Sequence, residues 1–103
     1  MADVWLLHES MGGTELFRAD AIEHLRSDRQ QVVARRVGGD AYTSILHISD
    51  RTELPTGFAV KLVQAIGQAR WDHPDDDSVI VIKLQSGRWQ LEASLLSDYD
   101  PSA

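Results

Sequence analysis

Alternating apolar and polar residues predict strands in the first half of the chain. The run from Val4 to Glu9 has a period of two and contains aromatic and branched side chains, which is typical of a strand. Two further runs of this kind, Gln31 to Val37 and Ala41 to Ser49, lie on either side of Gly38-Gly39-Asp40. Because glycine tolerates the backbone angles of tight turns, these two runs predict a β-hairpin.

Between residues 55 and 71 the apolar residues take the spacing of a helix. Five of them fall on one stripe: Phe58, Leu62, Ala65, Ile66 and Ala69. Pro55 suits the first turn of a helix, where its missing N–H costs no hydrogen bond, and Pro74 cannot continue one. Gly67 weakens such a helix by about 0.5–1 kcal/mol relative to alanine, unless a close neighbour needs the space. The pattern predicts one amphipathic helix from about Pro55 to Trp71.

Residues 14–29 fit two structures. Phe17, Ala21 and Leu25 recur every four residues, as on a helix. The segment nevertheless follows a glycine-containing turn and precedes a strand-like run, which favours a strand bent by a bulge near Asp20. We predict the bent strand, and the helix is the alternative.

A short resemblance supports the strand. The stretch Gly13-Thr14-Glu15-Leu16-Phe17-Arg18-Ala19-Asp20-Ala21-Ile22-Glu23-His24-Leu25 resembles a segment, read as strand, of a small bacterial swarming-motility protein family. It covers about an eighth of the chain. It includes no catalytic position, so it implies a strand and no function.

The last third of the chain predicts a C-terminal hairpin. Val79 to Leu84 places apolar residues on both faces, which indicates a central strand, and Ser86-Gly87 suits a two-residue turn before a last strand from Trp89 to Leu95. The predicted fold class is therefore α+β. It has one antiparallel sheet of about six strands, made of a four-strand meander, one long helix and this hairpin. We predict a single domain over residues 1–97 and a flexible tail over residues 98–103.

Composition narrows the classes of partner. The 103 residues carry a net charge of −6, which disfavours nucleic acid and anionic membranes. The chain has no cysteine and no run of about 20 apolar residues, so we predict no disulfide, no membrane partner and a cytoplasmic location. Frequent arginine, alanine and aspartate suggest a bacterial source.

The sequence contains no recognisable catalytic motif, and we predict neither an enzyme nor a cofactor. His8, His24 and His47 are candidate ligand-binding residues, because their predicted strands are neighbours if the meander forms. No short spacing brings them to one metal ion, so hydrogen-bonded histidines at the rim of the sheet are favoured over a metal site.

Four of the ten basic residues lie within eleven positions: Arg26, Arg29, Arg35 and Arg36. Arginine forks bind carboxylates and phosphates well, so these residues and Trp71 form a candidate interaction patch. An ordinary solvated hairpin rim is favoured, because surface ion pairs contribute little. The alternative is a docking surface for an acidic protein partner, an anionic small molecule or the Asp72-to-Asp77 loop of a second copy.

One function follows from the predicted strand at Val79 to Leu84. A single helix cannot cover both of its apolar faces, so we expect a second copy to cover the rest. We predict a non-enzymatic interaction or accessory module that self-associates, as a dimer. The alternative is a small-molecule or metal-binding domain that uses the histidines or the arginine patch.

Overall fold

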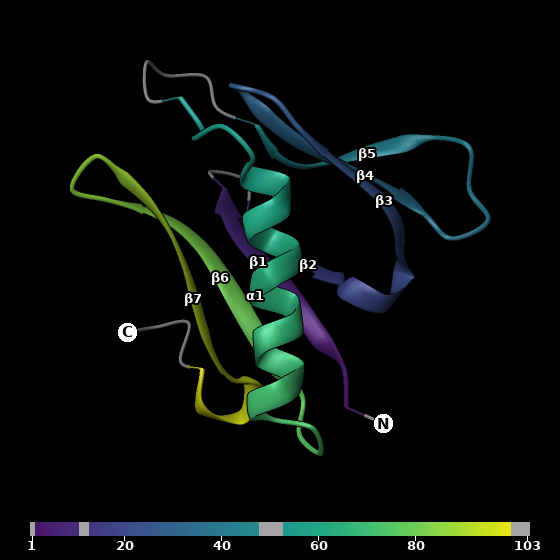
Figure 1. The fold of residues 1–103 in the computed structure, drawn as a ribbon, viewed down its shortest axis with the longest axis vertical. Coiled ribbons are helices and arrows are strands. Elements are labelled where there is room, and N and C mark those ends of the chain that lie inside the picture. Colours follow the sequence, from purple (N-terminus) through teal and green to yellow (C-terminus); the bar gives the residue numbers. More distant parts are fainter. Residues whose placement is uncertain (1, 11–12, 48–52, 100–103) are drawn as a thin grey trace.

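The computed structural model describes residues 2–10, 13–47 and 53–99. Seven strands, one α-helix and two 3-10 helices follow one another along the chain: β1 (Val4–Ser10), β2 (Gly13–Arg18), η1 (Ala19–Ala21), β3 (Ile22–Ser27), β4 (Gln31–Arg36), β5 (Tyr42–His47), α1 (Phe58–Asp72), β6 (Ser78–Gln85), β7 (Arg88–Leu95) and η2 (Leu96–Asp98). The fold is α+β, as predicted. Figure 1 shows α1 in front of one sheet, with the second sheet beside it.

The strands form two sheets, which corrects the single antiparallel sheet predicted from the sequence. Sheet A has the order β2-β1-β6-β7, and sheet B has the order β3-β4-β5. Within sheet A, β1 runs parallel to β6, with Leu6 paired to Ile80. The two apolar strands form the centre of sheet A, where both of their edges are hydrogen-bonded.

The segment that connects the sheets is the one whose structure was ambiguous in sequence. A bend does occur near Asp20, but it is the short helix η1. The two halves of the predicted bent strand pair with different partners, β2 with β1 and β3 with β4. A register shift between Ile22 and His24 adds a bulge at the start of β3. The predicted four-strand meander is therefore divided between the sheets.

Both predicted hairpins are present. β4 pairs with β5, and β6 pairs with β7 through the turn at Ser86-Gly87. Ser86 and Gly87 have φ angles of 53° and 77°, the positive values that a two-residue type I′ turn requires. Residues 11–12 of the predicted first turn and residues 48–49 of the predicted fourth strand lie outside the described residues.

The helix begins at Phe58, three residues after Pro55. Gly57 precedes it with a φ of 74°, in the left-handed region, so Pro55 cannot belong to the first turn. The hydroxyl of Ser27, at the end of β3, accepts a hydrogen bond of 3.0 Å from the N–H of Ala59. Sheet B thereby satisfies one free donor at the start of α1.

The core lies between α1 and the two sheets. Phe58, Leu62 and Ala69 of α1 are buried against the inward faces of both sheets, including Leu6 and Val32. Burial of each large apolar side chain contributes about 1.5–3 kcal/mol. This layer positions the outward face of α1 toward solvent.

The face of sheet A that points away from α1 is also covered in part. Leu7 and Val79 are only 1% and 0% exposed, although they do not belong to the cluster under α1. The η2 segment contacts β6, and Leu84 near the end of β6 is 39% exposed. The predicted need for a second copy over β6 is therefore wrong for the first half of this strand, because the chain itself buries it.

The C-terminal residues are described as far as Tyr99. Its backbone N–H donates to the carbonyl of Leu96. Residues 100–103 of the predicted flexible tail lie outside the described residues. Among the residues that are described, no helix is both long and apolar enough to cross a membrane.

Candidate functional site

An apolar stripe runs along the outward face of α1. Val60, Val63 and Trp71 are 60%, 58% and 84% exposed. Gly67 lies between them, and the successive spacings of three, four and four residues place all four on one side of the helix. A Cβ added to Gly67 meets no atom of the described residues within 4 Å, so their packing does not require glycine there.

Charged groups flank this stripe on one side. Lys61 and Asp72 are both exposed and lie about three turns apart on the same flank of α1. The amide of Gln68 donates a 3.0 Å hydrogen bond to Asp72. On the opposite flank Arg70 pairs with Asp20 of η1. The stripe therefore has an apolar centre and a polar rim, as protein interfaces have.

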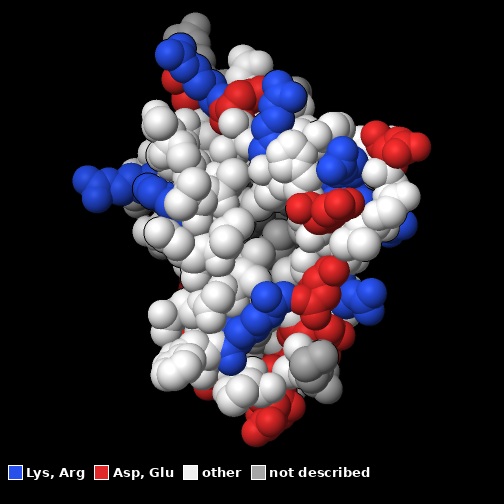
Figure 2. All heavy atoms as spheres, turned by 45° about the vertical axis from the view of Figure 1, so that its right-hand side comes forward, with Lys and Arg blue, Asp and Glu red and all other residues white. Residues whose placement is uncertain are grey.

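The structure divides the predicted arginine patch between surfaces. Arg26 and Arg35 lie on the outer face of sheet B, because their strands alternate with the buried positions Leu25 and Ala34. Arg36 follows on the opposite face, and Arg29 lies in the β3–β4 connection. Basic and acidic side chains lie beside one another on the side of the molecule shown in Figure 2.

Three polar side chains, those of His24, Arg35 and Tyr42, lie side by side across the three strands on the outer face of sheet B. His24 is paired in register with Arg35, and Arg35 with Tyr42. The ring of His24 reaches across β4, so that its Nδ1 lies 2.7 Å from the Tyr42 hydroxyl. The Arg35 guanidinium lies 5.9 Å from the centre of the Tyr42 ring, and its Nε is buried and has no hydrogen-bond partner among the described residues. This row can contact an anion through Arg35.

The three candidate histidines lie on three different strands. His8 is on β1 of sheet A, whereas His24 and His47 are on β3 and β5, the two edges of sheet B. Only the backbone of His47 is described. No group of three His, Asp or Glu residues in the described part of the chain is arranged to hold a metal ion.

Asp77, at the end of the Asp72-to-Asp77 loop, forms hydrogen bonds that hold neighbouring strands together. Its carboxylate accepts a 2.8 Å hydrogen bond from the backbone N–H of Asp3, and its own carbonyl accepts one from Leu96. The end of the loop thereby ties the two strands β1 and β7 to the start of β6. The neighbouring Asp75 and Asp76 are exposed.

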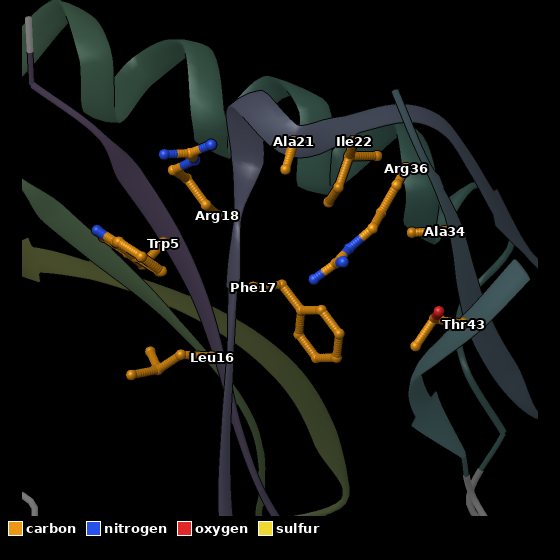
Figure 3. A pocket seen from close by; sticks show the side chains of 9 residues that line it. All are labelled: Trp5, Leu16, Phe17, Arg18, Ala21, Ile22, Ala34, Arg36 and Thr43. Carbon is orange, nitrogen blue, oxygen red and sulfur yellow. The ribbon is translucent and has the colours of Figure 1, made fainter. Parts of the chain in front are cut away.

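A groove of about 340 Å³ lies between β2, at the edge of sheet A, and sheet B. Figure 3 shows β2 passing through it, with Trp5, Leu16 and Arg18 on one side of the strand and Phe17 on the other. Across the groove lie Ile22, Ala34, Arg36 and Thr43, with Ala21 above. Arg36 extends toward Phe17, so the groove has an apolar floor and a cationic wall.

Sequence reasoning missed two of these surfaces. The spacing of Val60, Val63, Gly67 and Trp71 was a signal for a second helical stripe, but the buried stripe of the same helix was the stronger pattern. No sequence pattern indicated that Arg18 and Arg36 line the same groove, because the two residues are eighteen positions apart and lie on different sheets.

Comparison of the chain with protein-family models, with curated proteins and with solved structures gave no match. None of these comparisons supports the resemblance of Gly13 to Leu25 to the swarming-motility family. The assignment of a function depends on the surfaces themselves.

Proposed function

We propose that this protein is a non-catalytic interaction module that self-associates as a symmetric dimer through the outward face of α1. The observation that carries the proposal is the exposure of Trp71. Its side chain is 84% exposed and lies at the C-terminal end of the apolar stripe on α1. A large aromatic side chain in water at such a position is typical of an interface anchor.

The stripe is complementary to itself. When two copies of α1 cross in antiparallel fashion at Gly67, the Trp71 ring of each copy lies opposite Val63 of the other. The same two-fold axis brings Lys61 of one copy near Asp72 of the other, on the same flank of the pair. Opposite charges thus meet at both ends of the helix crossing, on one flank of the dimer, and the missing side chain of Gly67 lets the two backbones approach.

The size of the stripe indicates a moderate affinity. The exposed parts of Val60, Val63 and Trp71 make up a few hundred Å² at most, whereas a stable interface buries about 800 Å² from each partner. Polar residues such as Gln64 and Gln68 must therefore supply the rest of the contact. We expect a dissociation constant in the micromolar range.

The test is sedimentation velocity on the full chain from about 1 to 500 µM. We expect a concentration-dependent dimer, and we expect Trp71→Ala to remain monomeric while its circular dichroism and melting temperature stay unchanged. Tyr42→Ser, which removes another exposed aromatic side chain from sheet B, is the matched control and should still dimerise. A wild-type chain that is monomeric throughout this range overturns the proposal.

Charge reversal distinguishes self-association through α1 from other pairings. Lys61→Glu and Asp72→Lys should each weaken the dimer, because each places like charges across the axis. The double variant should restore it, since the opposite charges are then exchanged. Failure of the double variant to recover contradicts the antiparallel arrangement.

A second candidate function is anion binding by the outer face of sheet B. It is favoured by the buried Nε of Arg35, which lies beside Tyr42 and His24 and has no hydrogen-bond partner in the described part of the chain. Citrate and inorganic phosphate are suitable probes, and each should raise the melting temperature of the wild type. Arg35→Gln should abolish the rise. Equal rises in both proteins rule out this site.

We also propose a cytoplasmic location, on composition alone, because the chain has no cysteine with which to form the disulfides common in small exported domains. Cell fractionation with a tagged copy checks it.

A further inference from the structure

β2 is an edge strand whose second side is available. It is the first strand of sheet A and is hydrogen-bonded to β1 over its whole length, from Gly13 to Arg18. Among the described residues, the backbone hydrogen bonds outside helices and strands include none from β2. Every second N–H and C=O of the strand therefore points away from sheet A, and such a row is a template for another strand.

The groove beside β2 extends over both faces of this edge. Leu16 and Arg18 contact it from one face of the strand, and Phe17 contacts it from the other (Figure 3). A compact ligand touches one face of an edge strand. An extended backbone lying along the edge touches both, because its successive side chains alternate between the two faces.

The chemistry of the groove selects for a particular segment. Phe17, Ile22 and Ala34 provide an apolar surface on one side of the edge. Arg18 and Arg36 are exposed, and the described part of the chain gives neither guanidinium an ion pair. Among the residues whose side chains are described, no acidic residue lines the groove, in a chain whose net charge is −6. The groove is thus a local cationic region on an acidic protein.

We propose that the free edge of β2 accepts an extended acidic segment of a partner protein as an added strand of sheet A. Main-chain hydrogen bonds to β2 provide the affinity. Apolar side chains of the segment contact Phe17 and Ile22, and its carboxylates pair with Arg18 and Arg36. No residue of α1 lines the groove, so this site is separate from the proposed dimer interface and remains open in the dimer.

The probe is the hexapeptide acetyl-Glu-Val-Glu-Val-Glu-Val-amide, titrated to millimolar concentration into the full-length, ¹⁵N-labelled chain. We expect saturable amide shifts that are centred on β2 and on the residues across the groove. Two peptide controls define the mode of binding. Replacement of every Glu by Lys should abolish the shifts, and N-methylation of alternate backbone amides should do the same because it removes the donors of an added strand.

Two protein variants define the charge selection. The double variant Arg18→Gln/Arg36→Gln should weaken binding by about tenfold or more, the usual effect of losing hydrogen bonds to a charged group. Arg26→Gln, which changes an arginine on the outer face of sheet B, should bind like the wild type. Because all these arginines are solvent-exposed or on a sheet surface, the variants should remain folded, and their amide spectra verify this.

Four outcomes overturn the proposal. One is the absence of shifts at millimolar peptide. Equal binding of the N-methylated peptide indicates a small-anion site instead of strand addition. Equal binding of the lysine peptide removes the charge selection. Shifts at β2 that depend on protein concentration, without peptide, indicate that a second copy occupies the edge.

Discussion

The ring of Trp89 meets the ring of Phe58 edge to face, with centroids 6.4 Å apart and an interplanar angle of 71°. This contact joins β7 to the first residue of α1, so it couples the C-terminal hairpin to the helix. Phe58 is buried completely, whereas Trp89 is half-buried. The indole N–H of Trp89 is buried and finds no hydrogen-bond partner among the residues that the structure describes.

The contact between these two rings predicts how three variants rank in their loss of unfolding free energy. Phe58→Ala should lower the free energy of unfolding by about 3–5 kcal/mol, because it leaves a cavity under the helix. Trp89→Ala should cost somewhat less, since part of its ring is in water. Trp89→Phe should cost the least, because it keeps an aromatic edge against Phe58 and removes an unsatisfied donor. Urea unfolding followed by circular dichroism measures all three, and a costlier Trp89→Phe than Trp89→Ala contradicts the argument.

Gly67 predicts opposite effects on the monomer and on the dimer. Alanine should raise the helix stability of the monomer by about 0.5–1 kcal/mol, because its Cβ meets nothing in the single chain. The same Cβ should weaken the dimer if the two helices cross at this residue. Urea unfolding in a Trp71→Ala background isolates the first effect, and sedimentation of Gly67→Ala alone isolates the second. Unchanged association places the crossing elsewhere on α1.

The β6–β7 turn contains the only non-glycine residue with a positive φ in the described part of the chain, Ser86 at 53°. A left-handed conformation costs an L-residue about 1–2 kcal/mol, and asparagine tolerates it best among side chains. Ser86→Asn should therefore stabilise the protein by about 0.5–1 kcal/mol. Gly87→Ala should destabilise it by a similar or larger amount through the backbone alone, since its Cβ has free space. Thermal unfolding of the two variants checks the opposite signs.

Local patterns predicted most elements, because the periodicity of side chains depends on neighbouring residues. The strand at Val4 to Glu9, the hairpin around Gly38-Gly39 and the helix stripe of Leu62 all follow from spacing alone. The ends of a helix are less well determined by local sequence patterns. Gly57 has a left-handed backbone and Ser27 caps the helix from another strand, and neither effect is visible in the run from Pro55.

Pairing between distant strands was not predictable in the same way. Nothing local indicates that Leu6 pairs in parallel with Ile80, or that the chain changes sheets at Ala19–Ala21. The apolar faces of β6 suggested a missing partner, yet the chain buries Val79 itself. For the candidate sites, residue type identified Trp71 and Arg36, but the partners that give them a surface depend on the tertiary fold.

Asp28 predicts a dependence of stability on pH. The backbone N–H of Gln30 donates to its carboxylate at 2.8 Å and that of Gln31 at 3.0 Å. These bonds, the one from Gln30 first, hold the pKa of Asp28 below its ordinary value, and the charge of Arg26 adds to the effect. Since the folded chain binds this proton less readily than the unfolded chain, the stabilisation is complete above the ordinary pKa of about 4 and is lost as the pH falls through the lower folded value. Asp28→Asn should therefore be less stable than the wild type at pH 7, and the difference should shrink below pH 4. Urea unfolding at pH 7 and at pH 3 measures it, and a difference that grows on acidification contradicts this role of the carboxylate.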